Sequence, residues 1–525
     1  MKKKIVLLLT TSLLSGIALS ACGGSGRDPY ANLDFDEDIR GAKITMWTPF
    51  GSDMHAQVEA LVNRWSEKTG VQVVVEAKSG YDTLKSAISE SASTETYPNI
   101  TFAYPDHMAS YVGSDILLRL DTYFEKGSST KFDYAPENDV FAISDFYTDY
   151  MAENQSVEFK EDGSGYTLGV PFNKSTEVLT YNTTFFDWAK TKDEGIFVPS
   201  TWDEVDIVCD KILAVMENND VYGHFIGKDG KTYATNEEVI AATDDDALFD
   251  FSQVIDPKKA TDANRTFAFR PLARDSQANF FITTVRQYGG EYSSLDKATR
   301  KGKILFNSAE AKAGLKAMQD RYNANRIGIS QSWGEAKYSS NPFSALKCVM
   351  TVGSSAGADS NAPKGGKFDV SCAPVPFKDE SNKYVISQGT NLILLDKGSN
   401  AERIASWELL KYLTKYANGE FSKKTGYFPS CDFAFQSEEY QDFFNEKPRA
   451  MDAQINLAAA KVNKDVYTAP NTTWVKFVDA AFDGSSTVRT TVDTAMPLLF
   501  IGKNGKQYTP DEIVAQLYNS LSDYQ

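Results

Sequence analysis

The chain has 525 residues, which is enough for about two to four domains of ordinary size. It carries 54 Lys and Arg against 71 Asp and Glu, a net charge of −17. This acidic balance excludes nucleic acid as the main partner, because phosphate binding requires clustered basic residues. The 42% apolar content is that of a globular protein, and three His and five Cys offer little for a metal site or a disulfide scaffold. We therefore expect no metal and no cofactor.

The amino terminus predicts a secretory signal. Lys2–Lys4 are positive, and residues 5–19 are apolar but too short and too polar to span a membrane. The segment ends in Leu-Ser-Ala-Cys-Gly, which resembles the lipobox of bacterial lipoproteins and implies cleavage before Cys22 and lipidation of this residue. An ordinary signal peptide with a chance cysteine is the alternative. We expect residues 1–21 to be removed, and acyl chains on Cys22 to hold the protein at the outer face of the cytoplasmic membrane.

The next elements alternate between strands and helices. Residues 22–40 are polar and predict a flexible tether. Because strands and helices then alternate within about sixty residues, we expect right-handed crossovers and a parallel sheet. The strand over 71–75 is continuously apolar and is predicted to be buried on both faces. The predicted elements are a strand over 43–47, a helix carrying apolar residues from 54 to 65 and ending at Gly70, the strand over 71–75, a helix over 81–91 and a strand over 98–104.

The same alternation recurs later in the chain. Thr201 and Glu204 form a capping box that opens an apolar helix containing Cys209, which we expect to be buried. Strands are expected over 348–352 and 391–395. Two similar units, each a hairpin turn followed by a Thr-x-x-Glu capping box, predict a hairpin and then a helix. Further signals are helix caps at Ser308 and Asn400, the turns Asp229-Gly230 and Asn504-Gly505, and the boxes Thr235/Glu238 and Thr509/Glu512.

Signatures of catalysis are weak. The segment Gly353–Gly357 superficially suggests a nucleophile elbow after a strand, but all three histidines precede it, which disfavours catalysis by Ser354 or Ser355. No spacing singles out a pair of carboxylates for glycoside hydrolysis among the 71 acidic residues. A disulfide between Cys348 and Cys372 is one of several possible pairings of the four later cysteines, and the sequence does not choose among them.

A series of short segments, in order and at matching distances, resembles family 1 extracellular solute-binding proteins, the lipoprotein receptors that feed ABC importers. The resemblance covers nearly the whole chain after the signal, and its strength lies in the combination of segments. It implies an α/β, two-lobe periplasmic-binding-protein-like fold with a ligand cleft between the lobes. The segments are Ile44–Trp47, Thr69–Val73, Pro98–Ile100, Gly169–Phe172, Tyr181-Asn182, Val198–Glu204, Val349–Thr351, Ala373–Pro376 and Thr425–Pro429.

Within that family the chain looks most similar to the glycerol-3-phosphate-binding branch, through Pro171–Thr176, Thr351–Ala356 and Thr425–Pro429. The pattern departs from the branch at two places. Asn471–Trp474 stands where the branch has an arginine for the phosphate, and Asp275–Phe281 replaces a Trp-rich segment. Losing a bidentate guanidinium puts a phosphate ligand in doubt. The ligand contacts that the resemblance implies are Tyr81, Asp106, Ser175, Ser354 or Ser355, Gly389 and Tyr427.

The tryptophans divide into two predicted groups. Aromatic faces suit the apolar faces of sugar rings, and most aromatic residues of a globular protein belong to its core. Trp47, Trp333 and Trp474 are the candidates for the cleft. The residues expected in the core are Trp65, Trp188, Trp202 and Trp407.

These expectations define a lobe division and a function. The first lobe is predicted over 41–170 plus 383–430, and the second over 171–382 plus 431–525. We expect a monomeric substrate-binding lipoprotein of an ABC importer that closes on a sugar, oligosaccharide, polyol or glycerophosphate and passes it to the permease. A surface-anchored glycan hydrolase and a surface adhesin without a small ligand are the alternatives.

Overall fold

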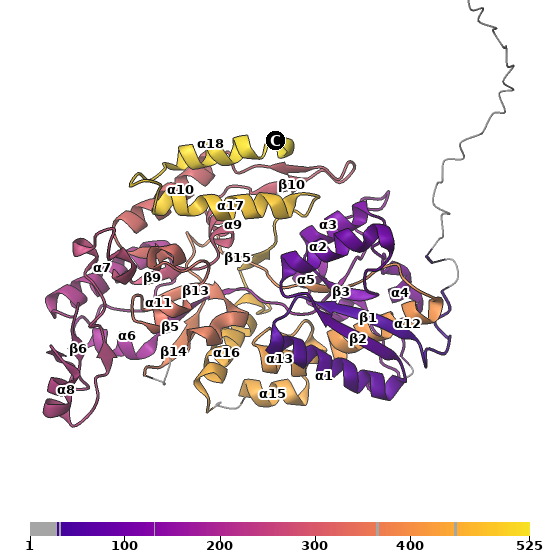
Figure 1. Cartoon of the computed structure of the whole chain (residues 1–525), viewed down its shortest axis with the longest axis horizontal. Helices are drawn as coiled ribbons and strands as arrows, with labels where there is room; N and C mark the ends of the chain where they lie inside the picture. Colours follow the sequence, from indigo (N-terminus) through magenta and orange to yellow (C-terminus); the bar gives the residue numbers. More distant parts are fainter. Residues whose placement is uncertain (1–28, 31–32, 131, 364–366, 446–448) are drawn as a thin grey trace, which may run out of the picture.

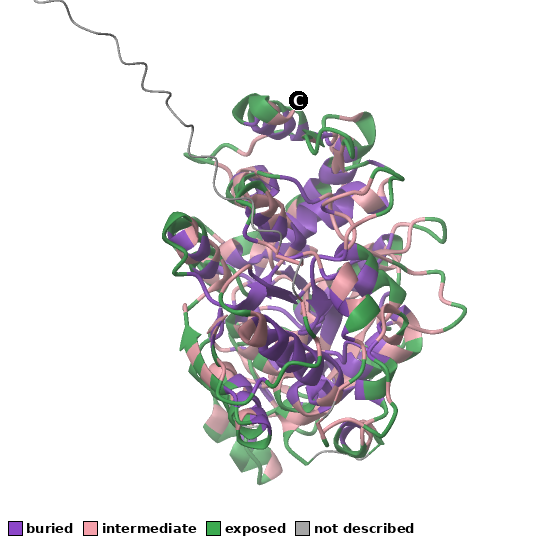
Figure 2. Cartoon of the chain, turned by 90° about the vertical axis from the view of Figure 1, so that its right-hand side faces the viewer, coloured by how far each residue is buried: buried purple, intermediate pink, exposed green. Residues whose placement is uncertain are grey.

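Two five-stranded mixed sheets, each flanked by helices, lie side by side in the computed structural model (Figure 1). The structure describes residues 29–30, 33–130, 132–363, 367–445 and 449–525. The predicted signal and Cys22 lie outside these residues. Buried residues concentrate in the strands and on the inner faces of the helices, and exposed residues on the outside (Figure 2). Each sheet has its own hydrophobic core.

The first sheet has the strand order β2-β1-β3-β16-β4, and we call the part built on it the first lobe. Its first three strands are parallel, as predicted. The two strands that complete the sheet run antiparallel to their neighbours, so the expectation of a wholly parallel sheet is wrong. The reason is that β16 enters from the other lobe and not through a helical crossover. The bounds are β1 (Lys43–Thr48), β2 (Gln72–Ala77), β3 (Ile100–Ala103), β4 (Val170–Pro171) and β16 (Asn391–Leu394).

Strand β2 is not buried on both faces, which corrects the prediction made from its apolar sequence. It forms the edge of the sheet and pairs only with β1 among the described strands. Val74 is 57% exposed on this edge strand. A run of valines therefore reflects the preference of branched side chains for extended backbone as much as burial.

The helices of the first lobe follow the predicted periodicities. Helix α1 buries Val58, Leu61, Val62 and Trp65 and ends at Gly70, whose φ of 74° is the left-handed conformation that glycine adopts at helix ends. The predicted helix over 81–91 matches α2 residue for residue. The bounds are α1 (Ser52–Thr69), α2 (Tyr81–Ser91), α3 (Pro105–Gly113), α4 (Asp121–Lys126), α5 (Thr148–Glu153), α12 (Asn400–Lys411) and α13 (Asn418–Thr425).

The second sheet has the strand order β12-β9-β13-β5-β14, and we call the part built on it the second lobe. Its strands β12, β9 and β13 are parallel, whereas β5 is antiparallel to both of its neighbours. The bounds are β5 (Glu177–Asn182), β9 (Leu272–Arg274), β12 (Ile327–Ile329), β13 (Met350–Ser354) and β14 (Val370–Ala373). The division into lobes at residues 170, 382 and 430 stays a prediction.

The capping signals of the second lobe are confirmed. Thr201 accepts from the backbone N–H of Glu204, whose carboxylate accepts from the N–H of Thr201. Thr235, Ser308 and Thr509 also cap their predicted helices. The bounds are α6 (Thr183–Lys190), α7 (Trp202–Asn218), α8 (Asn236–Thr243), α9 (Gln277–Gln287), α10 (Ala309–Asn323), α11 (Ser340–Ser344), α16 (Met451–Lys461), α17 (Ser485–Phe500) and α18 (Pro510–Ser520).

One cap is displaced by a residue. Ser399, and not Asn400, caps α12, because Ser399 makes a complete capping box with Glu402. Both predicted turns form tight connections, with β6 paired to β7 across Asp229-Gly230 and a bridge from Lys503 to Lys506. The remaining bounds are β6 (Phe225–Ile226), β7 (Thr232–Tyr233), β8 (Phe249–Asp250), β10 (Ser293–Leu295), β11 (Gly302–Ile304), β15 (Tyr384–Ile386), β17 (Val475–Phe477), α14 (Asp432–Phe435) and α15 (Glu438–Asn445).

The four described cysteines are free thiols, so Cys348 and Cys372 are not bonded to each other. Cys209 is fully buried in α7, as predicted, and burial raises the pKa of its thiol. The four tryptophans assigned to the core, Trp65, Trp188, Trp202 and Trp407, are all at most 5% exposed, which confirms that prediction.

Candidate ligand-binding site

Three chain segments that connect the lobes lie against one another. Lys174 and Ser175 lie in the link between β4 and β5, and Gln388 lies in the link between β15 and β16. The backbone N–H of Ser175 donates to Gln388 at 3.0 Å, and that of Gln388 donates back at 2.8 Å. The N–H of Phe428, after α13, donates to the carbonyl of Lys174 at 2.8 Å. This hydrogen-bonded group of links, which we call the hinge, fixes the side chains beside it.

A buried ion pair stabilises the hinge. The ammonium of Lys174 contacts the carboxylate of Glu153, on α5, and donates to the carbonyl of Gly389 at 3.1 Å. Both side chains are at most 1% exposed, and Asn391 donates to the same carboxylate at 3.0 Å. Burial lowers the pKa of Lys174, and Glu153 opposes that change. The ion pair therefore connects α5 to the β4–β5 link, through Lys174, and to the β15–β16 link, through Gly389.

Gly389 serves the packing of the hinge. Its φ is +92°, and a Cβ at this position would lie 1.7 Å from the carbonyl oxygen of Asn173. No other residue fits this close approach of two backbones. Its implied role as a ligand contact stays a prediction, and its conformation explains why glycine is needed here.

Hydroxyl groups gather beside the hinge on the first lobe. The hydroxyls of Tyr81 and Tyr427 lie 3.5 Å apart, and the amide of Asn173 donates to Tyr81 at 3.1 Å. The ring centroids of Tyr81 and Tyr104 are 4.9 Å apart, and Tyr427 stacks on Phe421. Burial raises the pKa of Tyr81, Tyr104 and Tyr427, so all three remain neutral phenols that both donate and accept hydrogen bonds. We call Tyr81, Tyr104, Asn173 and Tyr427 the hydroxyl cluster.

Serines of the second lobe reach the same hinge. Ser354, at the end of β13, donates to the hydroxyl of Ser175 at 3.4 Å and accepts from the N–H of Ala356. Ser355 is 1% exposed and accepts from the N–H of Thr176 at 3.1 Å. Ser354 therefore keeps an accessible hydroxyl near the hinge, whereas the hydroxyl of Ser355 is used to hold the hinge segment.

Helix α17 brings charged groups of the second lobe to α2 and α3 of the first (Figure 1). Lys85 of α2 donates to Ser486 at 2.5 Å, and Ser110 of α3 donates to Asp483 at 3.2 Å. Arg489 of α17 pairs with Asp479 at 3.1 Å. Burial opposes the charge of Arg489, but Asp479 together with Tyr292, Asp106 and Tyr104 raises its pKa. We call Asp106, Asp479 and Arg489 the charged cluster.

The structure thus brings together many of the predicted residues and leaves others apart. Tyr81, Asp106, Ser175, Ser354 and Tyr427 lie at the hinge or at the contact between the lobes. The predicted aromatic platforms have partners of their own. The ring centroid of Trp47 lies 3.8 Å from the ammonium of Lys78. Trp333 is buried and donates to the carbonyl of Ala268. Trp474 packs against Phe377 and Tyr467.

Sequence reasoning missed three residues of this region. Asn173 lies in one of the segments that carry the resemblance, but its side chain is oriented by contacts from distant segments: it accepts from Thr390 in the other link and donates to Tyr81. Asp479 and Arg489 lie in the last fifth of the chain and meet Asp106 only after folding. The available signal was an arginine between Val488 and Val492, which are spaced as on one face of a helix, since a charged residue beside buried apolar residues needs a partner.

The segment Asp275–Phe281 supplies a polar network. Asn279 donates to Glu177 at 3.3 Å and accepts from Arg489, and Glu177 pairs with Arg274. The carboxylate of Asp275 accepts from the backbone N–H of Ser339 at 2.6 Å and also from its hydroxyl. This network ties the charged cluster to the interior of the second lobe.

The buried carboxyl of Asp275 should make the stability of the protein depend on pH. Burial raises the pKa of its carboxyl from 3.8 to about 6. Because the native carboxyl holds its proton more tightly than the unfolded one, its stabilising contribution is full below about pH 4 and is lost as the pH rises through 6. Asp275→Asn should remove this dependence, worth up to about 3 kcal/mol. The difference in Tm between the variant and the wild type should move in favour of the variant from pH 4 to pH 7, and a constant difference would contradict the assignment.

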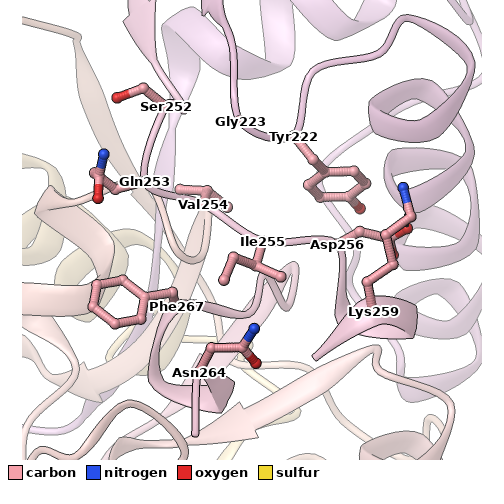
Figure 3. A pocket seen from close by; sticks show the side chains of 10 residues that line it. All are labelled: Tyr222, Gly223, Ser252, Gln253, Val254, Ile255, Asp256, Lys259, Asn264 and Phe267. Atoms are coloured by element: carbon pink, nitrogen blue, oxygen red, sulfur yellow. Dashed lines mark ion pairs between the residues drawn. The ribbon is translucent and has the colours of Figure 1, made fainter. Parts of the chain in front are cut away.

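Two surface hollows lie away from the hinge. One, of about 460 Å³, is on the second lobe (Figure 3) and is lined in part by Tyr222, Asp256 and Phe267. The other, of about 710 Å³, lies between β14 and α16. Neither includes a residue of the hydroxyl cluster or the charged cluster.

Neither a membrane span nor a metal cluster is found in the part of the chain that the structure describes. None of its helices combines the length and apolarity that crossing a bilayer requires. Within the same residues, no three His, Cys, Asp or Glu side chains gather as metal ligands would.

Two mixed α/β lobes joined by a three-segment hinge, with polar clusters between them, define the class of two-lobed solute-binding proteins. The chain belongs to the bacterial extracellular solute-binding protein family, whose model matches residues 60–449. This confirms the family resemblance read from the sequence.

Curated relatives and solved structures agree with this assignment. The chain is 23% identical to the sn-glycerol-3-phosphate-binding periplasmic protein UgpB of Pectobacterium atrosepticum over 90% of its length and 89% of that protein. Among solved structures, the GacH receptor of Streptomyces glaucescens has a TM-score of 0.60 at 15% identity, covering 92% of this chain and all of that one. UgpB of Mycobacterium tuberculosis, in complex with glycerophosphocholine, also has a TM-score of 0.60, at 15% identity, with 92% and 98% covered.

Proposed function

We propose that this protein is the lipid-anchored substrate-binding component of an ABC importer. It captures a sugar, a polyol or a glycerophosphate between its lobes and delivers it unchanged to a permease. The class follows from the family, and the relatives' names supply the ligand chemistry: acarbose for GacH, and glycerol 3-phosphate and glycerophosphocholine for the UgpB proteins.

The observation that carries the proposal is the hydroxyl cluster at the hinge. Tyr81 and Tyr427 present neutral hydroxyls next to aromatic faces, the buried Asn173 orients Tyr81, and Ser354 approaches from the other lobe. A polyhydroxylated molecule needs this combination, because its hydroxyls seek hydrogen bonds and its C–H faces pack on rings.

Closure needs groups from both lobes that act together. Tyr81, Tyr104 and Asp106 belong to the first lobe, and Ser354 and Arg489 to the second. A ligand that touches both sets only in the closed form shifts the population toward that form, since its affinity differs between the two forms. The permease would then recognise the closed shape.

A thermal-shift screen tests the proposal. Purified protein is heated with mono- and oligosaccharides, polyols and glycerophosphodiesters, and the compound that binds should raise Tm by a saturable amount that grows with concentration. Titration calorimetry should then give one site per chain. A screen in which no compound of these classes raises Tm would contradict the proposal.

The predicted anchor has its own test. Cys22→Ala should remove the lipidated thiol, so the protein should leave the membrane fraction and lose labelling by radioactive palmitate. Cys209→Ala, at a buried thiol, is the matched control and should leave both unchanged. Membrane retention of the Cys22→Ala protein would show that something other than this residue holds it there.

A further inference from the structure

The guanidinium of Arg489 is already occupied by the protein's own acceptors. One end lies 3.1 Å from the carboxylate of Asp479, and the other donates to the side-chain oxygen of Asn279. Asn279 is in turn held by the buried Glu177. An anionic ligand would have to displace a partly buried carboxylate, because the side chain of Asp479 is only 15% exposed.

The charges around Arg489 are acidic in sum. Against the opposing effect of burial, the charges of Asp479 and of Asp106, which belongs to the first lobe, both raise the pKa of Arg489, so that two carboxylates act on one guanidinium. Lys85, on α2 of the first lobe, donates to Ser486 of α17. A phosphate entering beside Arg489 would therefore meet the negative charge of Asp479 as well as the guanidinium.

The buried hydroxyl of Tyr292, in the second lobe, has no hydrogen-bond partner among the described residues. Tyr292 is 3% exposed. It lies within electrostatic reach of Asp479, Arg489 and Asp106. A buried hydroxyl without a partner is costly, and it would be satisfied by a neutral hydroxyl at a lower desolvation cost than by a phosphate.

We infer that Asp479 is a selectivity residue: by holding Arg489 in an ion pair it makes the site favour an uncharged polyhydroxylated ligand over a phosphate ester. This inference rests on the proposed function, because it names the ligand class of the same site. It also separates this chain from the ligand named for its curated relatives, glycerol 3-phosphate.

The test frees Arg489 and measures phosphate binding. Asp479→Asn keeps the shape of the side chain and removes its charge. We expect wild-type protein to bind inorganic phosphate and sn-glycerol 3-phosphate only at millimolar levels, and the variant to gain at least about tenfold in affinity for both. The double variant Asp479→Asn/Arg489→Gln should lose the gain. An equal Tm of the variants without ligand confirms that they fold.

Asp483→Asn is the matched control, since this exposed carboxylate lies on the same loop and should change phosphate affinity by less than about twofold. Micromolar binding of sn-glycerol 3-phosphate by the wild type, or no gain in Asp479→Asn, would overturn the inference without affecting the proposed function. If the gain appears but no sugar, polyol or glycerophosphodiester raises Tm of the wild type, the role of Asp479 in excluding phosphate stands and the proposed function fails.

Discussion

Replacing Lys174 by alanine should lower the free energy of unfolding by about 3–5 kcal/mol. The ammonium is fully buried, and its loss leaves the carboxylate of Glu153 buried without its counter-charge. The variant also loses the bond to the carbonyl of Gly389, which is one of the hydrogen bonds between two of the hinge links. Urea denaturation followed by circular dichroism measures the change, as a lower midpoint at an unaltered slope.

Lys211→Ala is the matched control for this substitution. Lys211 pairs with Asp193 at 2.7 Å, but the side chain is 35% exposed, so its loss should cost less than about 1 kcal/mol. If Lys174→Ala is no more destabilising than Lys211→Ala, the buried pair does not stabilise the hinge.

Tyr427→Ala should weaken binding of the ligand about 30- to 100-fold, while leaving Tm of the unliganded protein within a few degrees of the wild type. The substitution removes an aromatic face stacked on Phe421 and a hydroxyl next to that of Tyr81. A lost aromatic contact and hydrogen bond together cost about 2–3 kcal/mol. Titration calorimetry with the compound found by the thermal-shift screen gives the affinity.

Two further variants sharpen this result. Tyr427→Phe keeps the ring and removes only the hydroxyl, so it should lose about fivefold. Tyr233→Ala changes a half-buried tyrosine of the β6–β7 hairpin, far in sequence from the hinge, whose hydroxyl donates to Asp229, and it should bind as the wild type does. Equal affinity of Tyr427→Ala and wild type would remove Tyr427 from the site.

Local elements could be predicted because their causes are local. The cap at Thr201, the end of α1 at Gly70 and the span of α2 depend on residues within a few positions of one another. Serine and asparagine both cap helices well, so the residue type does not choose between Ser399 and Asn400. Ser399 is the cap because Glu402 completes a capping box with it.

Features that depend on distant segments were missed. The antiparallel entry of β16 and the exposed edge at β2 are set by strand order, which short-range patterns do not contain. Arg489 and Asp479 become partners of the first lobe only through the packing of α17 on α3. The resemblance to a known family named Tyr81 and Tyr427, which the structure brings together, and their contact with a ligand stays a prediction. The aromatic candidates Trp333 and Trp474 pack within the second lobe.

The central claim is that the protein binds a small solute between its lobes and releases it chemically unchanged. The most direct test incubates the protein with the compound that raises its Tm, separates the complex, and analyses the released ligand by mass spectrometry together with small-angle scattering of both forms. We predict one intact ligand per chain and a smaller radius of gyration in the complex. Recovery of a cleaved or modified compound, or binding with no change in shape, would contradict it.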